Sequence, residues 1–155
     1  MQRYEQARQS YLKALEVYDL LENIEERQKQ LWRATDFHQL GNVEYFLREY
    51  EEARKNYQQA LAIKVEFGDR YEQASTYHQL GRVAEDLEEF QEAKTNFLQA
   101  LSIWAEFNDQ YSLETFSIPA LIRLYQATQD PSILEAVAQI FGTTVDQIAT
   151  LFEEN

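Results

Sequence analysis

The chain has 155 residues, a size that suits one domain, and its 45% hydrophobic content is enough to bury a core, which excludes a disordered tail. Its net charge of −13 argues against binding to nucleic acids and to anionic membrane surfaces, because both require lysine and arginine. With 0 cysteines it has no disulfide framework, zinc knuckle or thiol nucleophile, and the cytoplasm is the default compartment.

The chain opens inside a predicted helix that runs from Met1 to about Leu21. Polar residues follow Met1, so there is no signal-peptide core, and no apolar segment of the chain reaches bilayer length. Tyr4, Tyr11 and Tyr18 recur every seven residues, in the pattern of the second helix of the repeats described next. We expect these tyrosines to lack their usual neighbour. Two explanations stay open: the chain is a fragment of a longer array, or its open end pairs with another chain.

Two repeats follow, 40 residues apart. His38-Gln39-Leu40-Gly41 recurs as His78-Gln79-Leu80-Gly81, and the segment 57–61 returns as 97–101. A fixed period of this size, built on helix-forming residues, is typical of a helical repeat array. Since there are only 4 glycines and 2 prolines and no alternating strand pattern, the predicted fold class is all-α, with long helices and short connections.

The repeats are predicted over residues 25–67 and 71–107. Their helices are expected at Glu25–Arg48, Glu51–Phe67, Tyr71–Leu87 and Glu89–Phe107. The first of these is lengthened at its start, because Leu15 and His38 are 23 positions apart whereas Leu61 and His78 are 17 apart. Alanines spaced seven apart lie on one face of each second helix and allow neighbouring helices to approach closely.

A third copy of the repeat is degraded. In the helix predicted over Tyr111–Thr128, Ile118-Pro119-Ala120-Leu121 replaces the His-Gln-Leu-Gly motif. Pro119 lies inside a helical pattern, so it should kink the helix or delay its start. We interpret this unit as the end of an array that occupies residues 1–129.

The tail, residues 130–155, is predicted to form a two-helix cap. Asp130-Pro131-Ser132 is a helix-start signal, Gly142 fits a helix end, and Thr143 or Thr144 caps the last helix. A Gly-Thr-Thr turn between short helices is also typical of a helix-turn-helix. No basic residue follows Arg123, however, which counts against DNA binding.

The residues of the two full copies resemble the tetratricopeptide repeat. The matching positions are Leu40-Gly41, Tyr50, Ala53, Tyr57 and Ala60, and then Leu80-Gly81, Phe90, Ala93, Phe97 and Ala100. The resemblance covers roughly residues 1–128 and implies antiparallel helix pairs that stack into a right-handed superhelix with a concave groove. The units are longer than usual, and Val65 and Ala105 stand where the family often has a proline. Such units are similar to the kinesin-light-chain-like repeats that are common in bacterial signalling proteins.

The resemblance also implies where a ligand would bind, because the first helix of each pair lines the groove. The implied groove residues are Thr35, His38, Asn42 and Tyr45, then Ser75, His78, Arg82 and Glu85, then Thr115, Ile118, Ile122 and Tyr125. Chaperone-binding members clamp a C-terminal carboxylate with Lys, Asn and Arg, but no lysine stands at the matching sites here. We therefore expect a groove that is polar at one end and apolar at the other, for an extended or helical peptide. The alternative for both histidines is hydrogen bonding within the array.

No group of residues supports catalysis or a metal site. His38 and His78 lie one repeat apart, roughly 10 Å by helix packing, which is too far for one metal ion. There is no recognisable nucleophile motif and no Gly-rich phosphate loop. We therefore predict no enzyme activity and no cofactor. Two functions remain: a scaffold that binds a peptide or partner protein in the groove, such as the sensor end of a larger signalling protein, and an architectural segment that forms a homodimer or filament through Tyr4, Tyr11 and Tyr18.

Overall fold

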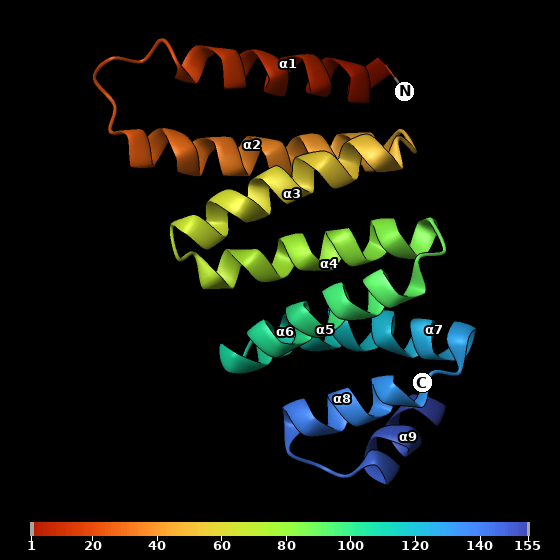
Figure 1. Ribbon diagram of the computed structural model, residues 1–155. Helices are drawn as coiled ribbons and strands as arrows, with labels where there is room; N and C mark the ends of the chain where they lie inside the picture. The colour runs from red at the N-terminus through yellow and green to blue at the C-terminus, as the bar shows by residue number, and fades with distance from the viewer. Residues whose placement is uncertain (1, 155) are drawn as a thin grey trace.

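A computed structural model describes residues 2–154, so Met1, the expected start of the first helix, lies outside the described residues. The helices are α1 Gln2–Tyr18, α2 Glu26–Phe46, α3 Tyr50–Glu66, α4 Arg70–Asp86, α5 Phe90–Glu106, α6 Gln110–Ser112, the π-helical turn η1 Leu113–Ser117, α7 Ile118–Thr128, α8 Pro131–Phe141 and α9 Val145–Glu153. They stack along one direction as a helical solenoid, from α1 at one end to α8 and α9 at the other (Figure 1). The predicted all-α repeat fold is confirmed; no strand occurs within residues 2–154.

The array is built from two complete antiparallel pairs, α2 with α3 and α4 with α5. Helix α1 packs on α2 as a second helix would pack on the next first helix, and α3 packs on α4 in the same way. The residues inserted before His38 lengthen α2, which has 21 residues against 17 in α4.

Each complete pair is held together by a glycine against an aromatic ring. A Cβ placed on Gly41 would lie 2.7 Å from Tyr57, and one placed on Gly81 would lie 2.5 Å from Phe97. Both rings are fully buried. The absence of a side chain at these two positions therefore permits the close approach of the helices, and the rings fill the space between them.

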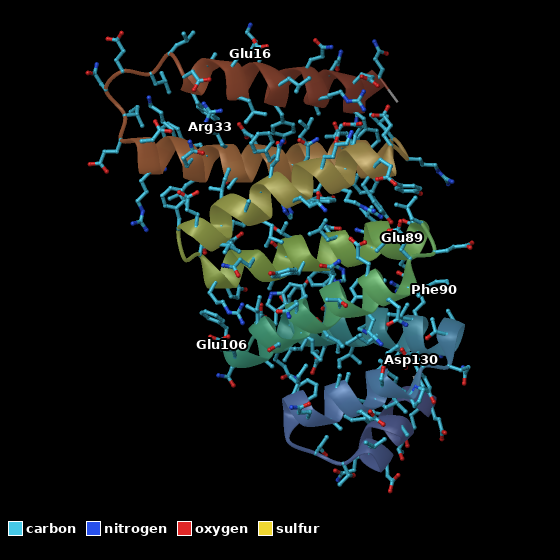
Figure 2. The ribbon with its side chains drawn as sticks, viewed as in Figure 1. Glu16, Arg33, Glu89, Phe90, Glu106 and Asp130 are labelled. Carbon is cyan, nitrogen blue, oxygen red and sulfur yellow. The ribbon has the colours of Figure 1, made fainter. Side chains whose placement is uncertain are left out.

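Ion pairs join each second helix to the start of the next one. Arg8 pairs with Glu49, Arg54 pairs with Glu89, and Lys94 pairs with Asp130 at 2.8 Å. Glu89 and Asp130 lie along the same edge of the molecule (Figure 2). The three basic residues each follow an alanine of the repeat, so the pairs recur with the period of the array.

The third unit departs from this plan. Pro119 has no backbone N–H to donate back along the helix, and the chain accommodates it with the π-helical turn Leu113–Ser117 just before α7. The helix predicted over Tyr111–Thr128 is thus divided into α6, this π-helical turn and α7, which begins one residue before Pro119. Leu121 stands in the position of Gly41 and Gly81, and its side chain is fully buried. Helix α8 packs mainly on α5 and α9 and only lightly on α7.

The tail begins and ends its helices at the expected residues. Asp130 caps α8 by accepting a hydrogen bond from the Ser132 backbone N–H, and Gly142 ends it with a φ of 64°. Thr144 starts α9 in a capping box with Gln147. The division of the chain into an array and a separate cap stays a prediction.

Candidate functional site

The first helices α2, α4 and α7 share one side of the molecule, which we call the first-helix face. Its accessible side chains are Thr35, Gln39, Asn42 and Phe46 on α2, Ser75, Gln79, Arg82 and Asp86 on α4, and Pro119, Arg123 and Gln126 on α7. Neighbouring helices exchange polar contacts along it. The Arg82 guanidinium lies 4.4 Å from the centre of the Tyr45 ring, the Tyr45 hydroxyl donates to Asp86, and Arg123 donates to both carboxylate oxygens of Glu85 at 2.9 and 2.7 Å.

Only part of the predicted groove lies on this face. Thr35, Asn42, Ser75 and Arg82 belong to it. The other predicted residues of α2 and α4 lie one position along the chain from this accessible stripe and contact the next helix or turn instead. They are His38, Tyr45, His78 and Glu85. The accessible stripe therefore follows positions 35, 39, 42 and 46 of α2 and 75, 79, 82 and 86 of α4. It includes Gln39, Phe46, Gln79 and Asp86, which are not among the predicted groove residues. An α-helix has 3.6 residues per turn, and either spacing fits that period.

His38 lies in a junction of polar side chains between α2, α3 and α4. Its Nδ1 is 3.1 Å from Thr76 Oγ1, and its ring is edge-on to Tyr57. The buried Lys64 ammonium donates to Thr76 Oγ1 at 2.9 Å and to the Glu72 carbonyl at 3.0 Å. Burial, with a smaller contribution from Lys64, lowers the pKa of His38 to about 4. The imidazole is therefore neutral at physiological pH, and we call this cluster the polar junction.

His78 occupies the equivalent position one repeat later, but its neighbours are aromatic. The Phe97, Trp104 and Phe116 rings lie 5.4, 5.8 and 5.6 Å from the imidazole, centre to centre. Its buried Nδ1 has no hydrogen-bond partner in the described part of the chain. Burial, followed by the Arg82 charge, lowers the pKa of His78 to about 4. We call this cluster the aromatic junction. Both histidines thus fill space between helices, and one of them hydrogen-bonds within the array.

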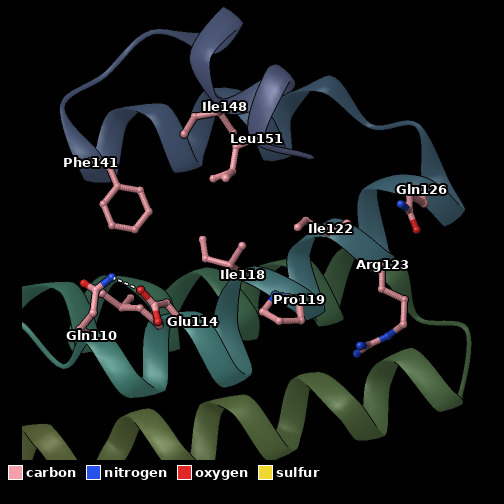
Figure 3. Close-up of a pocket in the computed structure, with 11 residues that line it drawn as sticks. Gln110, Glu114, Ile118, Pro119, Ile122, Arg123, Gln126, Phe141, Ile148 and Leu151 are labelled. Atoms are coloured by element: carbon pink, nitrogen blue, oxygen red, sulfur yellow. Dashed lines mark hydrogen bonds between the residues drawn. The ribbon is translucent and has the colours of Figure 1, made fainter. Parts of the chain in front are cut away.

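The apolar end of the predicted groove coincides with a cleft between α7 and the α8–α9 hairpin, with a volume of about 800 Å³ (Figure 3). Its lining consists of Gln110, Leu113, Glu114, Ile118, Pro119, Ile122, Arg123, Gln126, Phe141, Ile148 and Leu151. Ile118 and Ile122 were predicted groove residues. Tyr125 lies outside the cleft and packs edge-on against Phe152, and Thr115 is exposed but does not line it.

The cleft exists because the third helix pair is not closed. Where Gly41 and Gly81 let a second helix approach, the buried Leu121 side chain occupies the space, and α8 packs towards α5 and α9. In the sequence, Phe141, Ile148 and Leu151 belong to apolar stripes with helical spacing in residues 130–155. Nothing in those stripes indicated that the three side chains face α7 across a gap.

Helix α1 carries the residues of the second hypothesis. Tyr4 stacks on Phe46 with ring centres 5.5 Å apart, and the Tyr18 hydroxyl donates to Asp36 at 2.6 Å. Tyr11 is half-buried and, with Tyr4, borders a shallow depression against α2. The three tyrosines that were expected to lack their usual neighbour, the first helix of their own pair, face α2 instead, and self-association through them stays a prediction. Leu12 and Val17 of α1 and Leu20, just after the helix, are 44%, 41% and 76% exposed.

Other classes of site are not supported by the described residues. Within 2–154, no group of three or more His, Asp and Glu side chains is arranged to hold a metal ion. The helices of the same segment are all too short or too polar to traverse a lipid bilayer.

Comparison with known proteins identifies the repeats. A family model described as the tetratricopeptide repeat matches residues 32–106, from the middle of α2 to the end of α5. No match was found among curated proteins, and none among solved structures. Repeats of this family are non-catalytic scaffolds that generally mediate protein–protein interaction. The helix pairs α2–α3 and α4–α5 are therefore tetratricopeptide repeats.

Proposed function

We propose that this chain docks an apolar segment of a partner protein in the cleft between α7 and the α8–α9 hairpin. The observation that carries the proposal is the composition of the cleft: six of its lining residues are Leu113, Ile118, Ile122, Phe141, Ile148 and Leu151. Docking of this kind would serve an adaptor or the sensor end of a larger signalling protein.

Burial of apolar surface would drive binding there. Phe141 and Leu151, both on the α8–α9 wall of the cleft, are 41% and 37% exposed, which is high for side chains of their size in a concave site (Figure 3). Covering apolar surface contributes roughly 25 cal/mol per Å² removed from water. The polar residues stand at the two ends of the cleft, Gln110 and Glu114 at one and Arg123 and Gln126 at the other, where they can orient a ligand (Figure 3).

The remainder of the first-helix face is polar, in contrast to the apolar cleft, and is less suited to binding an apolar segment. Its arginines are engaged with neighbouring side chains, Arg82 with the Tyr45 ring and Arg123 with the Glu85 carboxylate, and a ligand would have to displace those contacts. Interactions between exposed charges are each worth little, so this polar part would add specificity more than affinity.

The test uses the whole chain and a fluorescent amphipathic peptide of leucine and glutamine, with leucines at helical spacing. The double variant Phe141→Gln, Leu151→Gln should weaken binding at least tenfold, because it removes two exposed apolar side chains from the α8–α9 wall of the cleft. The matched control is Leu12→Gln, Val65→Gln, which removes two exposed apolar side chains on other helices and should leave the affinity unchanged.

Backbone chemical-shift changes on titration locate the peptide independently. We expect them in residues 110–126 and 141–151. Changes confined to α2 and α4, or equal losses of affinity in both double variants, would contradict the cleft as the docking site.

A further inference from the structure

The surroundings of the cleft carry an unbalanced charge. From residue 124 to residue 154 the chain has five carboxylates, Asp130, Glu135, Asp146, Glu153 and Glu154, and no lysine or arginine. One of these, Asp130, is paired with Lys94. Arg123 is the basic residue of the lining, and both of its hydrogen bonds go to the Glu85 carboxylate. The cleft therefore has apolar walls, and the α8–α9 hairpin that forms one of them carries carboxylates and no basic residue.

Glu114 stands at one end of the cleft with no ion pair among residues 2–154. It accepts a hydrogen bond from the neutral Gln110 amide, one turn before it, and its side chain is exposed. Phe141 lies across the cleft from Gln110 and Glu114 (Figure 3). A carboxylate on one wall and an aromatic face on the other are the two groups that attract a lysine or arginine side chain.

The walls of the cleft restrict the backbone conformation of its occupant. Every wall is helical, so the backbone N–H and C=O groups along it are bonded within their own helices. An extended peptide would find no sheet edge to pair with and would leave its backbone groups unpaired against apolar side chains, which is costly. A helix satisfies its own backbone and needs only side-chain contacts.

Resting on the proposed function, we infer that the cleft binds an amphipathic helix of a partner protein that carries a lysine or arginine at the Glu114–Phe141 end. The aliphatic side chains of that helix contact Ile118, Ile148 and Leu151. Its basic residue lies between the Glu114 carboxylate and the Phe141 ring. A partner helix with an acidic residue at that end is rejected by Glu114 and by the acidic α8–α9 hairpin.

The test compares three peptides that share one leucine pattern, span about three helical turns and differ at one terminal position, which is lysine, glutamine or glutamate. Each is titrated into the whole chain by fluorescence anisotropy at physiological salt. The lysine peptide should bind roughly threefold to tenfold more tightly than the glutamine peptide, and the glutamate peptide should bind least tightly. Glu114→Gln should abolish the lysine advantage without changing the affinity of the glutamine peptide.

The control variant is Glu135→Gln, which makes the same change of charge on α8 at a residue that does not line the cleft. It should keep the lysine advantage. If Glu114→Gln and Glu135→Gln reduce the advantage equally, the effect is the general field of an acidic protein and the inference is overturned. Equal or tighter binding of the glutamate peptide overturns it as well. If none of the three peptides binds, the proposed function itself fails.

Sedimentation of the chain alone distinguishes a second copy as the occupant. We expect no concentration-dependent increase in mass. Self-association that is abolished by Phe141→Gln would mean that another copy of this chain fills the cleft, and it would overturn the assignment to a partner helix.

Discussion

Two junctions between neighbouring helix pairs, equivalent in sequence position, are filled in opposite ways. At the polar junction, Lys64 and Thr76 surround His38 with hydrogen bonds. At the aromatic junction, 40 residues later, Trp104 and Phe116 stand in the places of Lys64 and Thr76 around His78. Between α1 and α2 the corresponding space is filled in a third way, because the Tyr18 hydroxyl donates a hydrogen bond to Asp36. The repeat therefore requires that this space be filled, and it tolerates either hydrogen-bonded or apolar filling.

The polar and aromatic junctions differ in what they contribute to the free energy of unfolding. Burial lowers the pKa of Lys64, whose ammonium donates to a hydroxyl and a carbonyl and lies 3.7 Å from the Glu72 carboxylate. Trp104 is 4% exposed and contributes apolar burial without a charge to desolvate. We expect the aromatic junction to contribute more to the stability of the array than the polar junction.

The largest effect is expected from Trp104→Ala at the aromatic junction. Removing a buried indole and leaving a cavity should lower the free energy of unfolding by about 3–5 kcal/mol. Urea denaturation followed by circular dichroism measures the loss. Trp32→Ala is the matched control, because Trp32 is 36% exposed against Tyr18, and it should cost clearly less. Equal losses in the two variants would refute the difference in burial as the cause.

Both junctions should make the fold sensitive to acid. The pKa of each histidine is lowered from 6.5 to about 4 in the folded chain, so the unfolded chain binds more protons between these values. The free energy of unfolding therefore falls as the pH drops from 6.5 towards 4, by up to about 3 kcal/mol for each histidine. His78→Phe should reduce this acid sensitivity when unfolding is measured at neutral pH and near pH 4. An unchanged difference between the two pH values would show that His78 does not contribute to the acid sensitivity.

The polar junction can be converted towards the aromatic one. Thr76→Val alone deprives the buried Lys64 ammonium of an acceptor and should cost about 1–3 kcal/mol. The double variant Lys64→Met, Thr76→Val removes the charge as well, and we expect it to be more stable than the single variant. The comparison by urea denaturation forms a double-mutant cycle with Lys64→Met. Simple addition of the two single losses would contradict coupling through the Lys64–Thr76 hydrogen bond.

The smallest effect is expected in the turns that follow α3 and α5. Gly68, after α3, has a φ of 70°, and Asn108, its equivalent after α5, has a φ of 55°. Since the left-handed conformation costs a residue with a Cβ about 1 kcal/mol, Gly68→Ala should destabilise the chain by about that amount. Asn108→Gly should stabilise it slightly, because asparagine already tolerates this conformation better than most residues. Thermal unfolding measures both, and a stabilising Gly68→Ala would be inconsistent with the observed φ.

Much of the fold was predictable because its signals are periodic and local. Gly41 and Gly81 recur 40 residues apart next to apolar positions, and only a close helix contact explains a glycine within a helix there. The candidate site was predictable only in part. The predicted stripe through His38 and Tyr45 differs by one position from the exposed stripe through Gln39 and Phe46, and the 3.6-residue period does not separate the two.

The sequence by itself determined the repeat, the helix pairs and the unusual third unit at Pro119 and Leu121, since these follow from spacing and from the conformational limits of individual residues. Only the tertiary structure decided which neighbours surround each histidine and that a cleft separates α7 from the α8–α9 hairpin. The reason is physical: the distance between two helices depends on how all their facing side chains fill the space, and no single segment of the sequence contains that sum.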